Sequence, residues 1–303
     1  MKVTDMNNMT ALVSCFARAY HYRMNQVRIF SDDAAYPLLN ENYDQIAAHM
    51  MQGKDWFLPG FTGSAEEALR LIVDRQLSPS VLGRSAFCEQ MLEEAGRKGC
   101  RQYLILAAGY DTYGIRNRNS SLNVFEADLP ELLSDKKDRI RKAGLDSCSV
   151  YVPVDLSKPS WVNVLRENSD FVSERTFVSM LGISYYLPEE AFSMLLNTLG
   201  HLLPENSELC FDCPAEEEGH EAGRSRKLAH AAGEEMKAHY SLSQLKYILN
   251  QNGFRIQKLL DHNKMTEQFF KTYNTSAKEH PIEAPQGVCY VLAEKEKVQD
   301  LEK

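Results

Sequence analysis

The chain has 303 residues, a formal net charge of −8 at pH 7, 44% hydrophobic and 25% charged residues, a composition typical of globular proteins. The acidic balance argues against a nucleic-acid partner, because nucleic-acid-binding proteins present a basic face. The start of the chain lacks the features of a signal peptide and no stretch approaches the ~18 apolar residues of a membrane helix, so we expect a cytoplasmic protein with no membrane partner.

The first third of the sequence has mostly helical patterns. A capping box beginning at Ser64 opens a helix with an apolar face, and Pro79 is expected to end that helix. Another helix is expected over 85–95, where apolar residues recur at helical spacing. We interpret residues 1–100 as a helical N-terminal cap.

From residue 101 onward, short apolar runs alternate with helical patterns, which is typical of an α/β fold with a doubly wound, mostly parallel sheet. We interpret residues 101–303 as this core. Seven strands are expected, over residues 103–108, 122–127, 149–154, 176–181, 208–213, 254–260 and 287–293. Only a long loop is expected between the last two strands, which predicts that the final strand runs antiparallel.

A polar segment, residues 214–240, interrupts the alternation, and we interpret it as a lid over the core. It contains His220, His230 and His239, and nothing in the sequence singles out one of them as a general base. The catalytic residues therefore stay unassigned.

Seven cysteines are an odd number in a chain too long to need disulfide bonds, so we expect reduced thiols. Cys210 and Cys213 form a C-x-x-C pattern within an expected strand. Residues three apart on a strand point to opposite faces of the sheet, so these two sulfurs are not expected to share a metal ion. No metal site is predicted.

Consecutive expected strands end at Gly109, Asp128, Asp155 and Gly182. In an open parallel sheet these four positions meet at the edge where the strands end, here called the carboxyl edge, and that edge is where ligands bind. A tight small-residue turn followed by a strand that ends in an acid suits a nucleotide-like ligand. On their own, these residues leave open whether the ligand is S-adenosylmethionine or a dinucleotide.

A wider set of sequence features carries a family resemblance: Arg84, LILAAGYDT (104–112), VFEADLP (124–130), VPVDL (152–156), Trp161 and GISYYL (182–187). In this order the chain resembles the leucine carboxyl methyltransferase family of class I S-adenosylmethionine-dependent methyltransferases, which includes bacterial O-methyltransferases. The resemblance implies a Rossmann-like fold, S-adenosylmethionine as methyl donor, and an O-methyltransferase that modifies a carboxylate or hydroxyl of a small molecule.

The resemblance also implies roles for the residues at the strand ends. The backbone of Ala107, Ala108 and Gly109 would meet the methionine end of the donor, and Asp128 would accept hydrogen bonds from the ribose. Asp155 would accept from the adenine amino group.

Four further residues receive roles in the same way. The amide of Leu156 would face a ring nitrogen of the adenine, and Arg84 would clamp the donor carboxylate. Tyr185 and Tyr186 would line the acceptor site. Arg18 is a fainter match to a basic residue of the family's N-terminal helix.

Two positions depart from the family pattern. Glycine is usual at Ala107, and the glutamate that commonly holds the donor ammonium is replaced by Leu181. Leu181 still belongs to the expected donor site, but its substitution leaves open which group holds the ammonium.

Two alternatives therefore stay open. An NAD-dependent oxidoreductase would also use an acid at the second strand end, although the turn lacks the three-glycine fingerprint. A non-catalytic relative that binds S-adenosylmethionine would explain the missing acid. The sequence does not indicate an oligomeric state.

Overall fold

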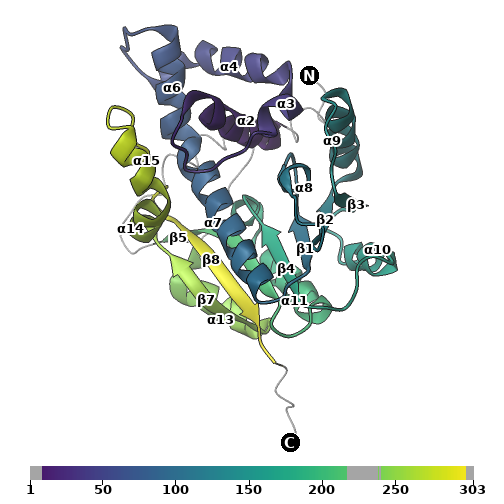
Figure 1. Ribbon diagram of the computed structural model, residues 1–303. Helices are drawn as coiled ribbons and strands as arrows, with labels where there is room; N and C mark the ends of the chain where they lie inside the picture. Colours follow the sequence, from purple (N-terminus) through teal and green to yellow (C-terminus); the bar gives the residue numbers. More distant parts are fainter. Residues whose placement is uncertain (1–8, 217–237, 239, 298–303) are drawn as a thin grey trace, which may run out of the picture.

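The computed structural model describes residues 9–216, 238 and 240–297, and its centre is one twisted β-sheet (Figure 1). Seven strands follow the spatial order β3-β2-β1-β4-β5-β8-β7, and the two-residue strand β6 (Tyr240–Ser241) pairs with β5 outside this series. The strands are β1 (Gln102–Leu106), β2 (Asn123–Asp128), β3 (Ser149–Pro153), β4 (Thr176–Met180), β5 (Glu208–Glu216), β7 (Phe254–Leu260) and β8 (Val288–Lys295). The predicted seven-stranded α/β sheet is confirmed.

Strand direction follows the prediction as well. Strands β1 to β5 pair in parallel, and β8 runs antiparallel to both β5 and β7. Because the strand order reverses between β1 and β4, the carboxyl edge opens a crevice beside β1, the usual ligand position in such sheets.

Helices cover both faces of the sheet. One face packs against α10 (Trp161–Glu167), α11 (Glu189–Leu202) and α13 (Leu242–Gln251). The other face packs against α7 (Ser78–Arg97) and α15 (Lys271–Ser276). Burial of these apolar faces is the main favourable contribution to the fold.

The sulfurs of the C-x-x-C pattern lie on opposite faces of the sheet, as predicted. Cys210 packs in the core on the α7 side and Cys213 in the core on the α11 side. Among the residues that the structure describes, no group of three or more His, Cys, Asp or Glu side chains is placed to hold a metal ion.

Above the carboxyl edge, the N-terminal helices form a separate apolar cluster (Figure 1). They are α2 (Met9–Met24), α3 (Ala35–Leu39), α4 (Asn42–Gln52), α5 (Lys54–Phe57) and α6 (Ala65–Gln76). Tyr110 and Ile115, which follow β1, belong to the same cluster, so the cluster packs on the turn after β1. Within the described ranges, no helix has both the length and the apolarity needed to cross a membrane.

The helix that opens at Ser64 ends at Gln76, before Pro79, as predicted, but two other helical predictions were wrong. Pro79 lies in the first turn of α7, where proline is well tolerated, so α7 begins seven residues earlier than the expected start at residue 85. The connection from β7 to β8 is helical rather than a loop: it contains α14 (His262–Met265), the π-helix η2 (Thr266–Phe270) and α15. These short turns lack a long helical repeat in the sequence.

Candidate functional site

The turn after β1 is held by the acid at the end of β2. The amide of Gly109 donates to Oδ2 of Asp128 at 2.7 Å, and the amide of Leu129 donates to Oδ1 at 2.7 Å. Burial raises the pKa of Asp128, and the two amide hydrogen bonds oppose that rise. Asp128 thus fixes the turn on one side and the start of α9 (Pro130–Lys142) on the other.

Ala107 occupies a backbone conformation that suits glycine. Its φ is +51°, as is that of Gly109. An alanine in the left-handed region costs about 1 kcal/mol because its Cβ approaches the following carbonyl. The predicted departure from glycine therefore coincides with a strained residue in the turn.

Asp155 organises the turn after β3. Its Oδ1 accepts from the amide and hydroxyl of Ser157, at 3.0 and 2.6 Å, and Lys158 lies 3.3 Å from Oδ2. The Ser157 hydrogen bonds lower the pKa of Asp155. The carboxylate is about one-third exposed, and the neighbouring Leu156 packs partly against the α11-side core.

Arg84, on α7, reaches the ends of β4 and β5. Its Nη1 lies 3.3 Å from Oδ2 of Asp212, and its Nη2 lies 3.5 Å from Oγ of Ser14 on α2. Burial lowers the pKa of Arg84, but Asp212 and nearby tyrosines raise it, so the net pKa is above its ordinary value. A Cβ at Gly182 would lie only 2.7 Å from the guanidinium nitrogens, so a larger residue at this position would clash with Arg84.

The predicted acceptor residues follow directly after β4, in the 3₁₀ helix η1 (Ser184–Tyr186). Tyr185 is buried, and its hydroxyl donates to Oδ2 of Asp212 at 2.8 Å. Tyr186 is half-buried and packs against the α7-side core. The hydroxyl of Tyr185 is thus directed at Asp212.

Helix α2 lies across the carboxyl edge. A Cβ at Gly109 would lie 3.2 Å from Cβ of Ala11, and one helical turn further along, Ser14 contacts Arg84. Any ligand held by the turn after β1 and by Arg84 would therefore lie beneath α2.

A buried charge network ties α2 to the turn after β1. Asp32 is fully buried and accepts from Nε of Arg18 at 2.8 Å and from the hydroxyl of Thr112 at 2.7 Å. Nε of Arg116 lies 3.3 Å from the same carboxylate. Burial alone would raise the pKa of Asp32, but the two arginines hold it below its ordinary value. Arg18 therefore has a structural partner in this network.

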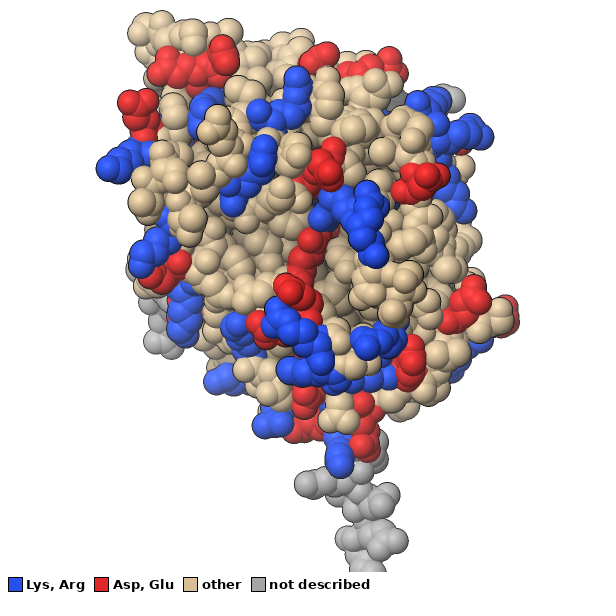
Figure 2. All heavy atoms as spheres, in the orientation of Figure 1, with Lys and Arg blue, Asp and Glu red and all other residues tan. Residues whose placement is uncertain are grey.

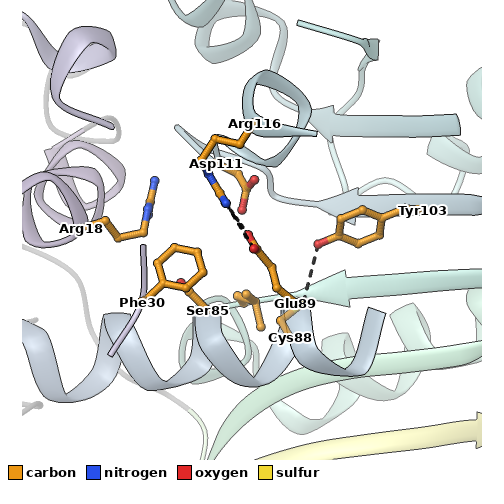
Figure 3. Close-up of a pocket in the computed structure, with 9 residues that line it drawn as sticks. Arg18, Phe30, Ser85, Cys88, Glu89, Tyr103, Asp111 and Arg116 are labelled. Carbon is orange, nitrogen blue, oxygen red and sulfur yellow. Dashed lines mark hydrogen bonds and ion pairs between the residues drawn. The ribbon is translucent and has the colours of Figure 1, made fainter. Parts of the chain in front are cut away.

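A small pocket lies beside this network, with a volume of about 10 Å³, room for about one water molecule. Asp111, Glu89 and Leu181 are among its lining residues. Figure 3 shows Glu89 extending from α7 to its ion pair with Arg116. Leu181 thus faces a polar pocket whose acids come from other elements.

A larger groove of about 860 Å³ runs along α7, between it and the segments 28–31 and 119–122. Figure 2 shows the hollow on this face, with acidic side chains along it. Glu89 and Phe30 line both the groove and the small pocket. Acids and arginines are mixed along it, so its charge does not select one sign of ligand.

Two important residues were missed by the sequence interpretation. Asp212 is an acid inside an apolar strand, which is a detectable signal, but its partner Arg84 lies 128 residues away. Asp32 carries no local signal, because its partners come from α2 and from the turn after β1. Most of the predicted lid, including His220, His230 and His239, lies outside the described residues.

Comparisons with known proteins identify a family and related methyltransferases. The family model described as leucine carboxyl methyltransferase matches residues 11–200. YktD of Bacillus subtilis (strain 168), provisionally named an S-adenosyl-L-methionine-dependent methyltransferase, is 32% identical over 279 residues, 87% of this chain and 91% of that protein. A Mycobacterium ulcerans (strain Agy99) protein with the same provisional description is 26% identical over 157 residues, 51% of this chain and 52% of its own length.

Solved structures show the same fold. A protein of Thermobifida fusca YX, provisionally named a methyltransferase, superposes with a TM-score of 0.55 at 15% identity. The match covers 95% of this chain and 94% of that one. It supports the architecture of the sheet and its flanking helices.

Proposed function

Because the chain belongs to the leucine carboxyl methyltransferase family and uses S-adenosylmethionine as methyl donor, we propose that it is an O-methyltransferase. The proposed acceptor is a carboxylate or hydroxyl of a small molecule. Family membership replaces the oxidoreductase alternative, which rested on the acid at the end of β2.

The observation that carries the proposal is the meeting of three groups at one edge of the sheet. The turn at Gly109, the carboxylate of Asp128 and the guanidinium of Arg84 all lie there, beneath α2. This set fits the donor: small residues admit a ligand to the backbone, an acid suits the ribose, and an arginine suits a carboxylate. Asp155 and Leu156 would complete the site at the adenine.

S-adenosylmethionine supplies a methyl group already made electrophilic by its sulfonium sulfur. What the chain must add is alignment of the acceptor oxygen with that methyl group and exclusion of water. Helix α2 lies where it would cover the donor, and we propose that the cap (residues 1–100) and the lid (214–240) enclose the acceptor. The core would then be residues 101–303.

The matched family favours an oxygen acceptor, because it is named for carboxyl methylation. A carboxylate also needs no general base, because it is already a nucleophile.

The test is a methyl-transfer screen with radiolabelled S-adenosylmethionine and panels of carboxylic acids, phenols, amines and thiols. Alkali releases methanol from a methyl ester but leaves a methyl ether intact, so product stability separates the two oxygen acceptors. Label on carboxylic acids or phenols is expected. Label found exclusively on amines or thiols would contradict the proposal.

A further inference from the structure

Asp212 on β5 lies beside Leu181, the position after β4 where the family usually has glutamate. Met180 and Phe211 are partners in the parallel register of β4 and β5, so the next residues, Leu181 and Asp212, are also neighbours. Asp212 is 1% exposed. A buried carboxylate therefore lies at the carboxyl edge, one strand away from the position where the family usually has glutamate.

Asp212 is held by donors from three elements. The amide of Gly182 donates to its Oδ1 at 2.7 Å, while Tyr185 and Arg84 approach Oδ2 at 2.8 and 3.3 Å. Burial and Asp212 raise the pKa of Tyr185 well above its ordinary value, so its hydroxyl remains a donor. The carboxylate is thus fixed in position, and its neighbour Arg84 provides the opposite charge.

Arg84 is not held tightly by its partners. The contact from Arg84 to Asp212 and the contact from Arg84 to Ser14, at 3.3 and 3.5 Å, are long for charged hydrogen bonds. Tyr290 is 1% exposed, packs at Gly83 beside Arg84, and its hydroxyl has no hydrogen-bond partner among the described residues. A buried polar atom without a partner is costly, and a bound polar group would relieve that cost.

We propose that Asp212 binds the ammonium of the donor's amino-acid end while Arg84 binds its carboxylate. An α-amino acid group carries one positive and one negative charge, and the adjacent Asp212 and Arg84 present the complementary pair. This inference rests on the proposed function, and it supplies from β5 the acid that Leu181 lacks.

Two other acids lie near Leu181, in the small pocket. Glu89 is committed to its ion pair with Arg116. Asp111 accepts from the amide of Tyr113 through Oδ1, at 2.7 Å, which organises the turn. Asp111→Asn is therefore the matched control, because it removes the same charge from an acid that the proposal does not use.

The test compares two ligands on each variant by calorimetry: S-adenosylhomocysteine and its deamino analogue, which differ in the ammonium alone. Loss of the ammonium should weaken binding to the wild type and to Asp111→Asn roughly 10- to 100-fold, the range for hydrogen bonds between charged groups. In Asp212→Asn, the affinities for S-adenosylhomocysteine and for the deamino analogue should differ less than about threefold. 5′-Methylthioadenosine, which lacks the amino-acid end, should bind all three proteins equally and reports that each is folded.

The loss of affinity on removing the ammonium is here called the ammonium penalty. An equal ammonium penalty in wild type and Asp212→Asn would overturn the assignment, as would a penalty abolished in Asp111→Asn. If Asp212→Asn does not bind 5′-methylthioadenosine, the comparison is made with Asp212→Glu, which keeps the charge but moves it by one methylene. An unchanged penalty in Asp212→Glu would likewise overturn the assignment, and a reduced one would support it. A wild type that binds neither ligand would contradict the proposed function itself.

Discussion

The two halves of the proposed donor site are built differently. The adenosine half, at the ends of β2 and β3, would use Asp128 and Asp155, which lie at the positions expected from the family pattern. The methionine half, at the ends of β1, β4 and β5, has a strained alanine at Ala107, an apolar Leu181 and the ion pair of Arg84 with Asp212.

The difference lies in the range of the contacts. Asp155 bonds within three residues of itself, and Asp128 bonds the next amide and the turn 19 residues before it. Arg84 depends on Asp212, 128 residues away, and on Ser14, 70 residues away. A half built on distant contacts can lose one acid and recruit another from a neighbouring strand without leaving a sequence motif.

The largest effect is expected from Arg84→Ala. Removing the guanidinium takes away the proposed carboxylate clamp and leaves Asp212 buried without its ion partner. Binding of S-adenosylhomocysteine should weaken roughly 100-fold, and binding of 5′-methylthioadenosine less than threefold, as measured by calorimetry. Arg84→Lys keeps the charge but not the planar guanidinium. Its affinity for S-adenosylhomocysteine should lie between those of wild type and Arg84→Ala. Equal losses for both ligands would show that Arg84 does not act on the methionine half.

Asp128→Asn should affect both ligands alike, because both contain the ribose. Asparagine keeps one acceptor oxygen where aspartate serves two backbone amides and, by proposal, the ribose. We expect roughly tenfold weaker binding of each ligand. Asp155→Asn, at a carboxylate that is about one-third exposed, is the comparison, and its affinity for both ligands should fall less. A loss confined to S-adenosylhomocysteine would contradict the division into two halves.

Ala107→Gly should stabilise the protein by about 1 kcal/mol, because glycine adopts φ +51° without the Cβ clash. The free energy of unfolding in urea is the measurement. Ala108→Gly, next to it and outside the left-handed region, is the matched control and should be neutral or destabilising. Stabilisation of both variants, or of neither, would show that Ala107 is not strained.

The smallest expected effect concerns how Asp128 and Asp155 change the pH dependence of the free energy of unfolding, where the two acids should act with opposite sign. The folded pKa of Asp128 is raised, so its contribution to stability is present at low pH and is lost as pH rises through that pKa. The folded pKa of Asp155 is lowered, so its contribution is present above its ordinary pKa of 3.8 and is lost as pH falls. Unfolding of Asp128→Asn and Asp155→Asn from pH 3 to 7 should therefore differ from wild type with opposite slopes. Slopes of the same sign would contradict these environments.

The sequence was sufficient for the sheet because its strands carry local apolar patterns, and the strand over residues 254–260 was predicted with its observed bounds. It also predicted that Asp128 and Asp155 end neighbouring strands, since both positions follow from strand order. It could not reveal the network of Asp32 or the pairing of Arg84 with Asp212. Both depend on tertiary packing that brings α2, α7 and the strand ends together.

The most direct test of the two-part site is calorimetric titration of the wild type with S-adenosylhomocysteine and with 5′-methylthioadenosine. A methionine half built on Arg84 and Asp212 predicts that S-adenosylhomocysteine binds at least roughly tenfold tighter than the ligand that lacks the amino-acid end. Equal affinities for the two ligands, or no heat with S-adenosylhomocysteine at millimolar concentration, would contradict a methionine half built on Arg84 and Asp212.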